Sequence, residues 1–163
     1  MQTNFQKLKI FTDGGARGNP GPAACGVIIK DGQNKVIARH AKYLGRRTNN
    51  QAEYEGVLLA LTEAQKFGLP RRSLQIDGVE TEGKAGLPRR VKAGKIELDF
   101  YLDSELVVNQ LKGSYKVKDA DLQKLFVKIW NLSQSFKKIT YTYVPRAMNA
   151  MADRLVNEEL DKN

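Results

Sequence analysis

The spacing of apolar residues changes near position 48, and this change limits the fold class of the 163-residue chain more than any other feature. Residues 7–12 alternate between polar and apolar types, and residues 24–30 and 35–43 also have the composition of strands. Between the second and third runs, Asp31-Gly32 is a typical hairpin turn. The chain therefore should begin with three antiparallel strands.

After Asn50 the apolar residues follow a helical spacing instead. Thr48, Asn49 or Asn50 would cap this helix at its start, and residues 68–70, which are Gly-Leu-Pro, would end it. The apolar stripe that predicts the helix consists of Tyr54, Val57, Leu58, Leu61 and Ala64.

The second half of the chain returns to a mixture of strands and helices. A stripe of apolar residues from Leu122 to Trp130 marks one of the helices, and we expect Trp130 to lie in the core. The order β-β-β-α-β-α-α-β-α predicts an α/β fold, with one five-stranded mixed sheet flanked by helices. The elements predicted after residue 95 are a strand at 96–102, helices at 104–112 and around 122–130, a strand at 139–144 and a helix at 147–160.

We expect one domain over residues 1–163, a length that can bury a real core. Residues 68–97 differ from the rest: they hold five glycines, two prolines and the tetrapeptide Leu-Pro-Arg-Arg twice. This composition is typical of a loop, so we interpret residues 68–97 as an insertion.

The chain is basic, with 27 lysines and arginines against 18 acids and a net charge of +9. A surface of this charge attracts polyanions, nucleic acids first among them. No apolar run approaches the roughly 18 residues of a membrane span, and the N-terminus lacks a secretory signal. The single cysteine, Cys25, allows no internal disulfide. We therefore expect no membrane association and a cytoplasmic location.

Four acids occupy distinctive positions. Asp13 ends the first predicted strand and Asp103 ends the fourth. Glu53 lies in the first turn of the first helix, and Asp153 lies early in the last helix. If those two strands are neighbours, the acids meet at one edge of the sheet. Clustered carboxylates repel unless divalent cations neutralise them, and Mg²⁺ prefers such oxygen ligands. Any one of these acids taken alone is better interpreted as a solvated surface residue.

Four segments containing these acids resemble the motifs of the type 1 ribonuclease H family. They occur in the family order, and together with the elements between them they span residues 7–160 apart from the insertion. The segments are TDGGARGNPGP at 12–22, TNNQAE at 48–53, LDSELV at 102–107 and VPRAMNAMADRL at 144–155.

The resemblance implies a ribonuclease H-like fold and cleavage of the RNA strand of RNA–DNA hybrids, leaving 5′-phosphate and 3′-hydroxyl ends. It implies that two Mg²⁺ ions, or Mn²⁺ as a substitute, are held by Asp13, Glu53, Asp103 and Asp153. Backbone N–H groups from Gly14 to Arg17 would face the sugar–phosphate chain. The substrate contacts that the resemblance implies are Gly14, Gly15, Asn19, Thr48, Asn49, Asn50, Gln51, Arg146 and Asn149.

The chain departs from the commonest family pattern in two places. The loop before Asp153 has no histidine, since the only histidine is His40 in the third predicted strand. This pattern resembles the histidine-lacking subgroup, and Arg146 is the candidate for a phosphate or product contact there. The segment after residue 111 is too short for a basic handle helix, so its lysines are the candidate phosphate contacts: Lys112, Lys116 and Lys118.

Two other functions remain open at this point. The chain could be a non-catalytic hybrid-binding module on the same fold, although such modules usually lose a metal-binding acid. It could also be a DNA-cleaving relative, such as a junction resolvase, although the Gly-Asn-Pro-Gly turn and the Thr-Asn-Asn segment match the hybrid-reading group. We expect a monomer in either case.

Overall fold

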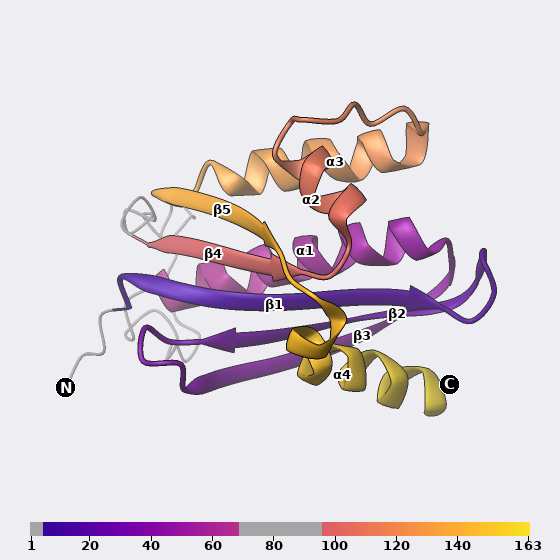
Figure 1. The fold of residues 1–163 in the computed structure, drawn as a ribbon, viewed down its shortest axis with the longest axis horizontal. Coiled ribbons are helices and arrows are strands. Elements are labelled where there is room, and N and C mark those ends of the chain that lie inside the picture. Colours follow the sequence, from indigo (N-terminus) through magenta and orange to yellow (C-terminus); the bar gives the residue numbers. More distant parts are fainter. Residues whose placement is uncertain (1–4, 69–95) are drawn as a thin grey trace, which may run out of the picture.

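The computed structural model describes residues 5–68 and 96–163. Five strands form one sheet in the order β3-β2-β1-β4-β5 (Figure 1). Strand β1 pairs antiparallel with β2 and β2 with β3, whereas the β1–β4 and β4–β5 pairs are parallel. The predicted mixed sheet is thus confirmed. The strands are β1 (Lys7–Ala16), β2 (Gly21–Lys30), β3 (Val36–Arg47), β4 (Glu97–Leu102) and β5 (Lys138–Tyr143).

The helices follow in the predicted order within the described residues. They are α1 (Asn49–Gln65), α2 (Glu105–Leu111), α3 (Ala120–Ser133) and α4 (Ala150–Asp161), with short 3₁₀ turns η1 (Lys66–Gly68) and η4 (Arg146–Asn149). Most of the segment interpreted as an insertion, residues 69–95, lies outside the described part. Its flanks belong to regular elements, because Gly68 ends η1 and Glu97 begins β4.

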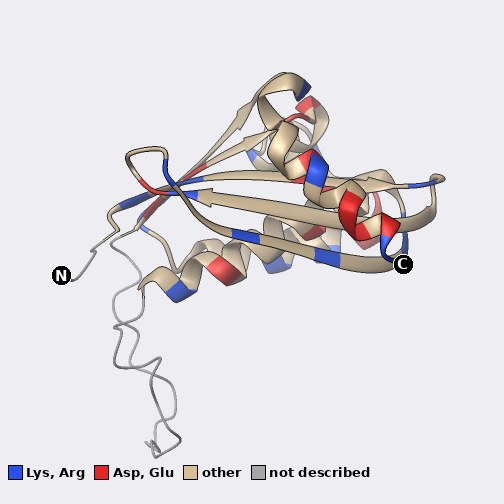
Figure 2. Cartoon of the chain, turned by 90° about the horizontal axis from the view of Figure 1, so that it is seen from below, with Lys and Arg blue, Asp and Glu red and all other residues tan. Residues whose placement is uncertain are grey.

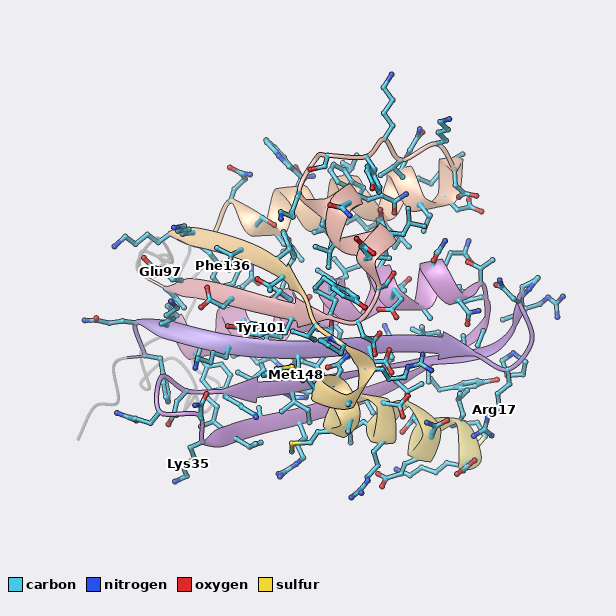
Figure 3. The ribbon with its side chains drawn as sticks, viewed as in Figure 1. Arg17, Lys35, Glu97, Tyr101, Phe136 and Met148 are labelled. Atoms are coloured by element: carbon cyan, nitrogen blue, oxygen red, sulfur yellow. The ribbon has the colours of Figure 1, made fainter. Side chains whose placement is uncertain are left out.

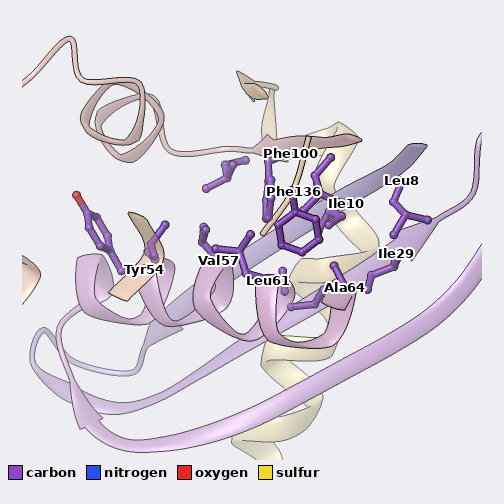
Figure 4. Close-up of a cluster of buried hydrophobic side chains, with 14 of the residues drawn as sticks. Leu8, Ile10, Ile29, Tyr54, Val57, Leu61, Ala64, Phe100 and Phe136 are labelled. Carbon is purple, nitrogen blue, oxygen red and sulfur yellow. The ribbon is translucent and has the colours of Figure 1, made fainter. Parts of the chain in front are cut away.

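Helices cover both faces of the sheet, and Figure 2 shows α1 and α4 on opposite sides. Helix α1 packs on β1, β2 and α3, while α4 packs on β1, β2 and β3. The main core lies between the sheet and α1, where Leu8, Ile10, Leu61 and Phe100 are fully buried (Figure 4). This core follows from the alternation of the strands and the helical stripe of α1.

Strand β1 approaches α1 very closely at Gly14. A Cβ atom at this position would lie 2.2 Å from the carbonyl carbon of Ala52 and 2.4 Å from the backbone nitrogen of Glu53. Only glycine permits this approach, so the residue type brings the strand against the first turns of the helix.

The prediction that the first strand ends at Asp13 was wrong. Strand β1 continues to Ala16, and its pairing with β2 extends from Lys9–Lys30 to Ala16–Ala23. Glycines do not interrupt a strand when a neighbouring strand supplies the ladder hydrogen bonds. The true turn covers residues 17–20, where Gly18 has a φ of 100° that favours glycine.

The prediction that Trp130 lies in the core was also wrong, because its exposed fraction is 57%. In α3 the buried residues are Leu122 and Ile129. Trp130 follows Ile129 by one position, and one residue turns a helix by about 100°, which directs the indole away from the core.

Replacing Gly14 by alanine should lower the free energy of unfolding by about 1–3 kcal/mol or more, because the added methyl group overlaps the α1 backbone. Urea denaturation would measure the change. The matched control is Gly32→Ala, whose Cβ meets nothing within 4 Å, and it should stay within about 0.5 kcal/mol of the wild type. Equal stability of the two variants would contradict the described β1–α1 contact.

Candidate functional site

Three of the four predicted acids lie together at one edge of the sheet. One carboxylate oxygen from each of Asp13, Glu53 and Asp103 lies within 4.8 Å of the others. Asp13 comes from the interior of β1, and Asp103 directly follows its parallel neighbour β4. Glu53 lies in α1 just past the first turn, slightly later than predicted. At this point the α1 backbone packs directly against Gly14 of β1.

The acid cluster, as we call these three residues, is almost completely removed from solvent. The exposed fractions are 3% for Asp13 and 7% for Glu53, and the side chain of Asp103 is 4% exposed. Burial, and then the charges of Asp103 and Asp153, raise the pKa of Asp13 to about 7. Burial and the neighbouring Asp13 and Asp103 also raise the pKa of Glu53 well above its usual value. Both carboxyl groups therefore hold protons to a higher pH than an isolated carboxyl does when no cation is bound.

The oxygens of the acid cluster fit a hard divalent cation. Glu53 Oε2 and Asp103 Oδ2 are buried and have no hydrogen-bond partner among the described residues. Buried polar atoms are normally paired, so these two need an explanation. The donors are all carboxylate oxygens, the type that hard cations prefer over softer ligands. A cation would supply the missing partner and offset the repulsion between the acids.

Arg146 is the one cation that pairs with the cluster in the described part of the chain. Its Nε lies 3.7 Å from Asp103 Oδ2, while its own side chain is 79% exposed. An exposed guanidinium next to a buried carboxylate can turn toward a ligand without losing solvation.

Asp153, the fourth predicted acid, lies in the first turn of α4 and is half-buried. Its oxygens are not part of the three-residue cluster, yet its charge contributes to the raised pKa of Asp13. Asn157, one turn further along α4, donates from Nδ2 to Asp153 Oδ2 at 3.4 Å. Asp153 thus borders the acid cluster without joining it in this structure.

Hydrogen bonds join the turn after β1 to the start of α1. Thr48 is the N-cap, and it forms a capping box with Gln51. Asn19 Oδ1 accepts from the Asn49 backbone N–H at 3.0 Å, and Asn49 Oδ1 accepts from the Ala16 backbone N–H at 2.9 Å. Four of the predicted substrate residues therefore form one connected group, which consists of Asn19, Thr48, Asn49 and Gln51.

This connected group overturns one expectation about the turn. The Ala16 N–H is held by Asn49, and the Arg17 N–H donates to the Pro22 carbonyl at 2.8 Å. Both backbone donors are thus used within the chain, so the expectation that they face the sugar–phosphate chain was wrong. They fix the shape of the turn instead.

The other predicted substrate residues differ in their surroundings. Asn149 is 1% exposed and donates from Nδ2 to the Thr12 carbonyl at 2.8 Å, which ties η4 to β1 beside Asp13. Gly15 lies in β1 opposite Ala24, and Asn50 is half-buried in the first turn of α1. The roles of all these residues as substrate contacts stay predictions.

Sequence reasoning missed the part played by Arg17. Its guanidinium donates to Asp161 Oδ1 at 2.6 Å, and this pair joins the turn after β1 to the end of α4. The two residues are 144 positions apart, so no local pattern could have indicated the contact. His40, on β3, lies 3.5 Å from Glu63 of α1 and takes no part in the acid cluster.

Within residues 5–68 and 96–163, no helix has the length and apolar composition needed to cross a bilayer.

The metal-free protein should lose stability as the pH rises from about 4 to about 7. The Asp13 carboxyl has a pKa near 3.8 in the unfolded chain and about 7 in the folded one. In this window the folded state binds more protons, so a rise in pH favours the unfolded state, by at most about 1.4 kcal/mol for each unit of pKa difference. Urea denaturation across this range, in the presence of a chelator, would measure the effect.

The control for this measurement is Asp13→Asn, which removes the titrating group with little change in size. Its stability should depend less on pH than that of the wild type. Identical pH dependence in the two proteins would contradict the raised pKa of Asp13.

Two family models together match most of the chain. The model described as RNase H matches residues 6–76, and the model described as reverse transcriptase-like matches residues 71–159. A bifunctional protein, Rv2228c of Mycobacterium tuberculosis, is 39% identical over 156 residues, which are 95% of this chain. The chain spans only 36% of the length of that relative.

Solved structures agree with the described fold. The RNase H1 of the halophilic archaeon Halobacterium salinarum is 34% identical with a TM-score of 0.77, over 96% of this chain and 99% of that one. LC11-RNase H1, crystallised in complex with an RNA/DNA hybrid, is 37% identical with a TM-score of 0.75, over 95% and 97% of the two chains. These matches, the sheet order and the acid cluster agree with each other, and the chain belongs to the type 1 ribonuclease H family.

Proposed function

We propose that this chain is an endoribonuclease that hydrolyses the RNA strand of RNA–DNA hybrids, using two Mg²⁺ ions and leaving 5′-phosphate and 3′-hydroxyl ends. The observation that carries the proposal is the buried acid cluster, two of whose carboxylate oxygens have no hydrogen-bond partner among the described residues. Family membership supports the same reading, and so does the hybrid-bound structure of LC11-RNase H1. Mn²⁺ would substitute for Mg²⁺ because it prefers the same oxygen ligands.

In this proposal Asp13, Glu53 and Asp103 hold the cations, with Asp153 at the edge of the same site. Cations held by these carboxylates would supply Lewis-acid chemistry, which is activation of a water and stabilisation of the leaving oxygen of the phosphodiester. The protein supplies the rigid arrangement: Asp13 is fixed within the sheet, and Glu53 is fixed by the contact between Gly14 and α1. Asp103 directly follows β4.

The connected group at the start of α1 would hold the hybrid backbone. The positive end of a helix dipole attracts phosphate, and Thr48 and Asn49 lie at this end of α1. Asn19 is linked to Asn49, so the turn after β1 and the helix would contact the substrate as a unit. Arg146, exposed beside Asp103, would contact a phosphate of the substrate or product.

Two alternatives make different predictions. A non-catalytic binding module would bind the hybrid without cleaving it, but all four acids are present and three are assembled. A DNA-cleaving relative would cut duplex DNA. We also keep a monomeric state and a cytoplasmic location as predictions.

Replacing Asp103 by asparagine should reduce hybrid cleavage by at least about 10²-fold, since it removes one charged ligand from a site that acts through electrostatic stabilisation. The assay uses a labelled RNA–DNA hybrid with Mg²⁺ and, separately, with Mn²⁺. Duplex DNA, duplex RNA and single strands are assayed in parallel.

The matched control is Asp99→Asn, because Asp99 lies on β4 but pairs with Lys7, away from the acid cluster. This variant should retain nearly full activity. Hybrid binding by the wild type without cleavage under either metal would favour the binding module. Cleavage of duplex DNA would favour the DNA-cleaving alternative.

Replacing Lys116 by alanine should reduce the salt dependence of hybrid binding, with a slope of log K against log salt smaller by about 1. Lys116 is exposed in the segment between α2 and α3, and we propose it as a phosphate contact together with Lys112 and Lys118. Binding is measured at several salt concentrations with Ca²⁺ in place of Mg²⁺. The control is Lys66→Ala at the far end of α1, and equal slopes for the two variants would exclude the contact.

A further inference from the structure

A small, open pocket lies on the face of the sheet that carries α4, outside the acid cluster. Most of the side chains that line it are apolar, and Lys30 and the buried Asn149 are its polar members. The pocket measures about 190 Å³ including its open mouth. Two methionines at its rim are unusually exposed, Met148 by 63% and Met151 by 41%. Figure 3 shows Met148 at the front of the sheet, near Tyr101 and beside α4. The residues that matter for the argument are Phe11, Ile28, Lys30, Met148, Met151 and Ala152, and we call them the methionine pocket.

Three cations surround the methionine pocket on the same face. Lys9 of β1 lies directly opposite Lys30 of β2, and Arg39 of β3 lies directly opposite Ile28 of the pocket. Residues opposite each other in antiparallel strands point to the same face, and like charges in such pairs are destabilising. Lys9, Lys30 and Arg39 form no ion pair within the described part of the chain.

The acid nearest in sequence does not compensate this charge. Asp31 Oδ1 accepts from the backbone N–H groups of Gln33 and Lys35, so it is committed to the turn between β2 and β3. Lys9 itself donates to a neutral side chain, the Oδ1 atom of Asn34, at 2.8 Å. Asp99 of β4 lies directly opposite Lys9, but its carboxylate pairs with Lys7 at 3.0 Å. The three cations therefore leave the rim of the pocket positive.

The chemistry of the pocket disfavours a nucleobase. The ring of Phe11 stacks on Tyr101 with centroids 4.9 Å apart, and Lys30 Nζ lies 4.8 Å above the ring. Tyr101 comes from β4 and Lys30 from β2, and β1 lies between these two strands. The two side chains therefore cover opposite faces of the Phe11 ring, and neither face is free to stack on a base.

We propose that the methionine pocket binds an acidic peptide segment of a partner protein, one that combines carboxylates with bulky apolar side chains. One apolar side chain of the peptide fills the pocket, where the flexible methionines adapt to its shape. The carboxylates lie over Lys9, Lys30 and Arg39, the three cations that form no ion pair in the described part of the chain. This inference rests on the surface alone and does not depend on the catalytic proposal.

The methionines offer a direct test, because the chain has only three and two of them line the pocket. A protein labelled with ¹³C at the methionine methyl groups is titrated with a short synthetic peptide of alternating glutamate and leucine, and NMR spectra are recorded. The signals of Met148 and Met151 should shift saturably while that of Met1 stays in place. Peptides with serine for leucine, or with glutamine for glutamate, should bind at least tenfold more weakly.

Variants separate the pocket from general charge attraction. Lys30→Glu and Met151→Ser should each weaken peptide binding at least tenfold while hybrid cleavage is retained. The matched control is Lys128→Glu, the same change in charge on the exposed surface of α3, and it should bind the peptide as the wild type does. Equal weakening by Lys128→Glu would overturn the proposal.

Two further outcomes would also overturn it. One is a titration in which the peptide leaves the Met148 and Met151 signals unmoved. The other is a shift produced by single-stranded RNA or by an RNA–DNA hybrid but not by the peptide, which would make this surface a nucleic-acid contact.

Discussion

The contact between β1 and α1 at Gly14 is the constraint on which the site depends. Because this residue has no side chain, the strand lies against Ala52 and Glu53, and the carboxylates of Asp13 and Glu53 become neighbours. The parallel pairing of β1 with β4 then brings in Asp103. Burial and mutual repulsion raise the pKa values of Asp13 and Glu53, so the cluster is costly without a cation.

The regions around the acid cluster are held by polar contacts between distant segments. Asn19 and Asn49 join the turn after β1 to the start of α1, and Asn149 joins η4 to β1. Arg17 connects the same turn to the end of α4 through Asp161. A surface built in this way is arranged before a ligand arrives, which reduces the ordering that binding would otherwise require.

Much of this arrangement could be predicted from the sequence, because alternation, helical stripes and the four motif segments all indicate the same fold. Local sequence patterns gave wrong predictions where residues distant in the sequence determine the structure. Strand β1 continues past Asp13 because β2 supplies its hydrogen bonds, and Trp130 lies one helical position beyond the buried stripe. The Arg17–Asp161 pair and the exposed surface of Met148 depend on tertiary placement, which no sequence window contains.

The most direct test of the account is a calorimetric titration of the protein with Mn²⁺ at pH 7, in two buffers with different heats of ionisation. If the acid cluster is a cation site that retains protons until a cation displaces them, binding will be saturable and will release protons. Asp13→Asn should release fewer. Saturable binding without proton release, or no binding by the wild type, would contradict the assignment of the acid cluster as the cation site.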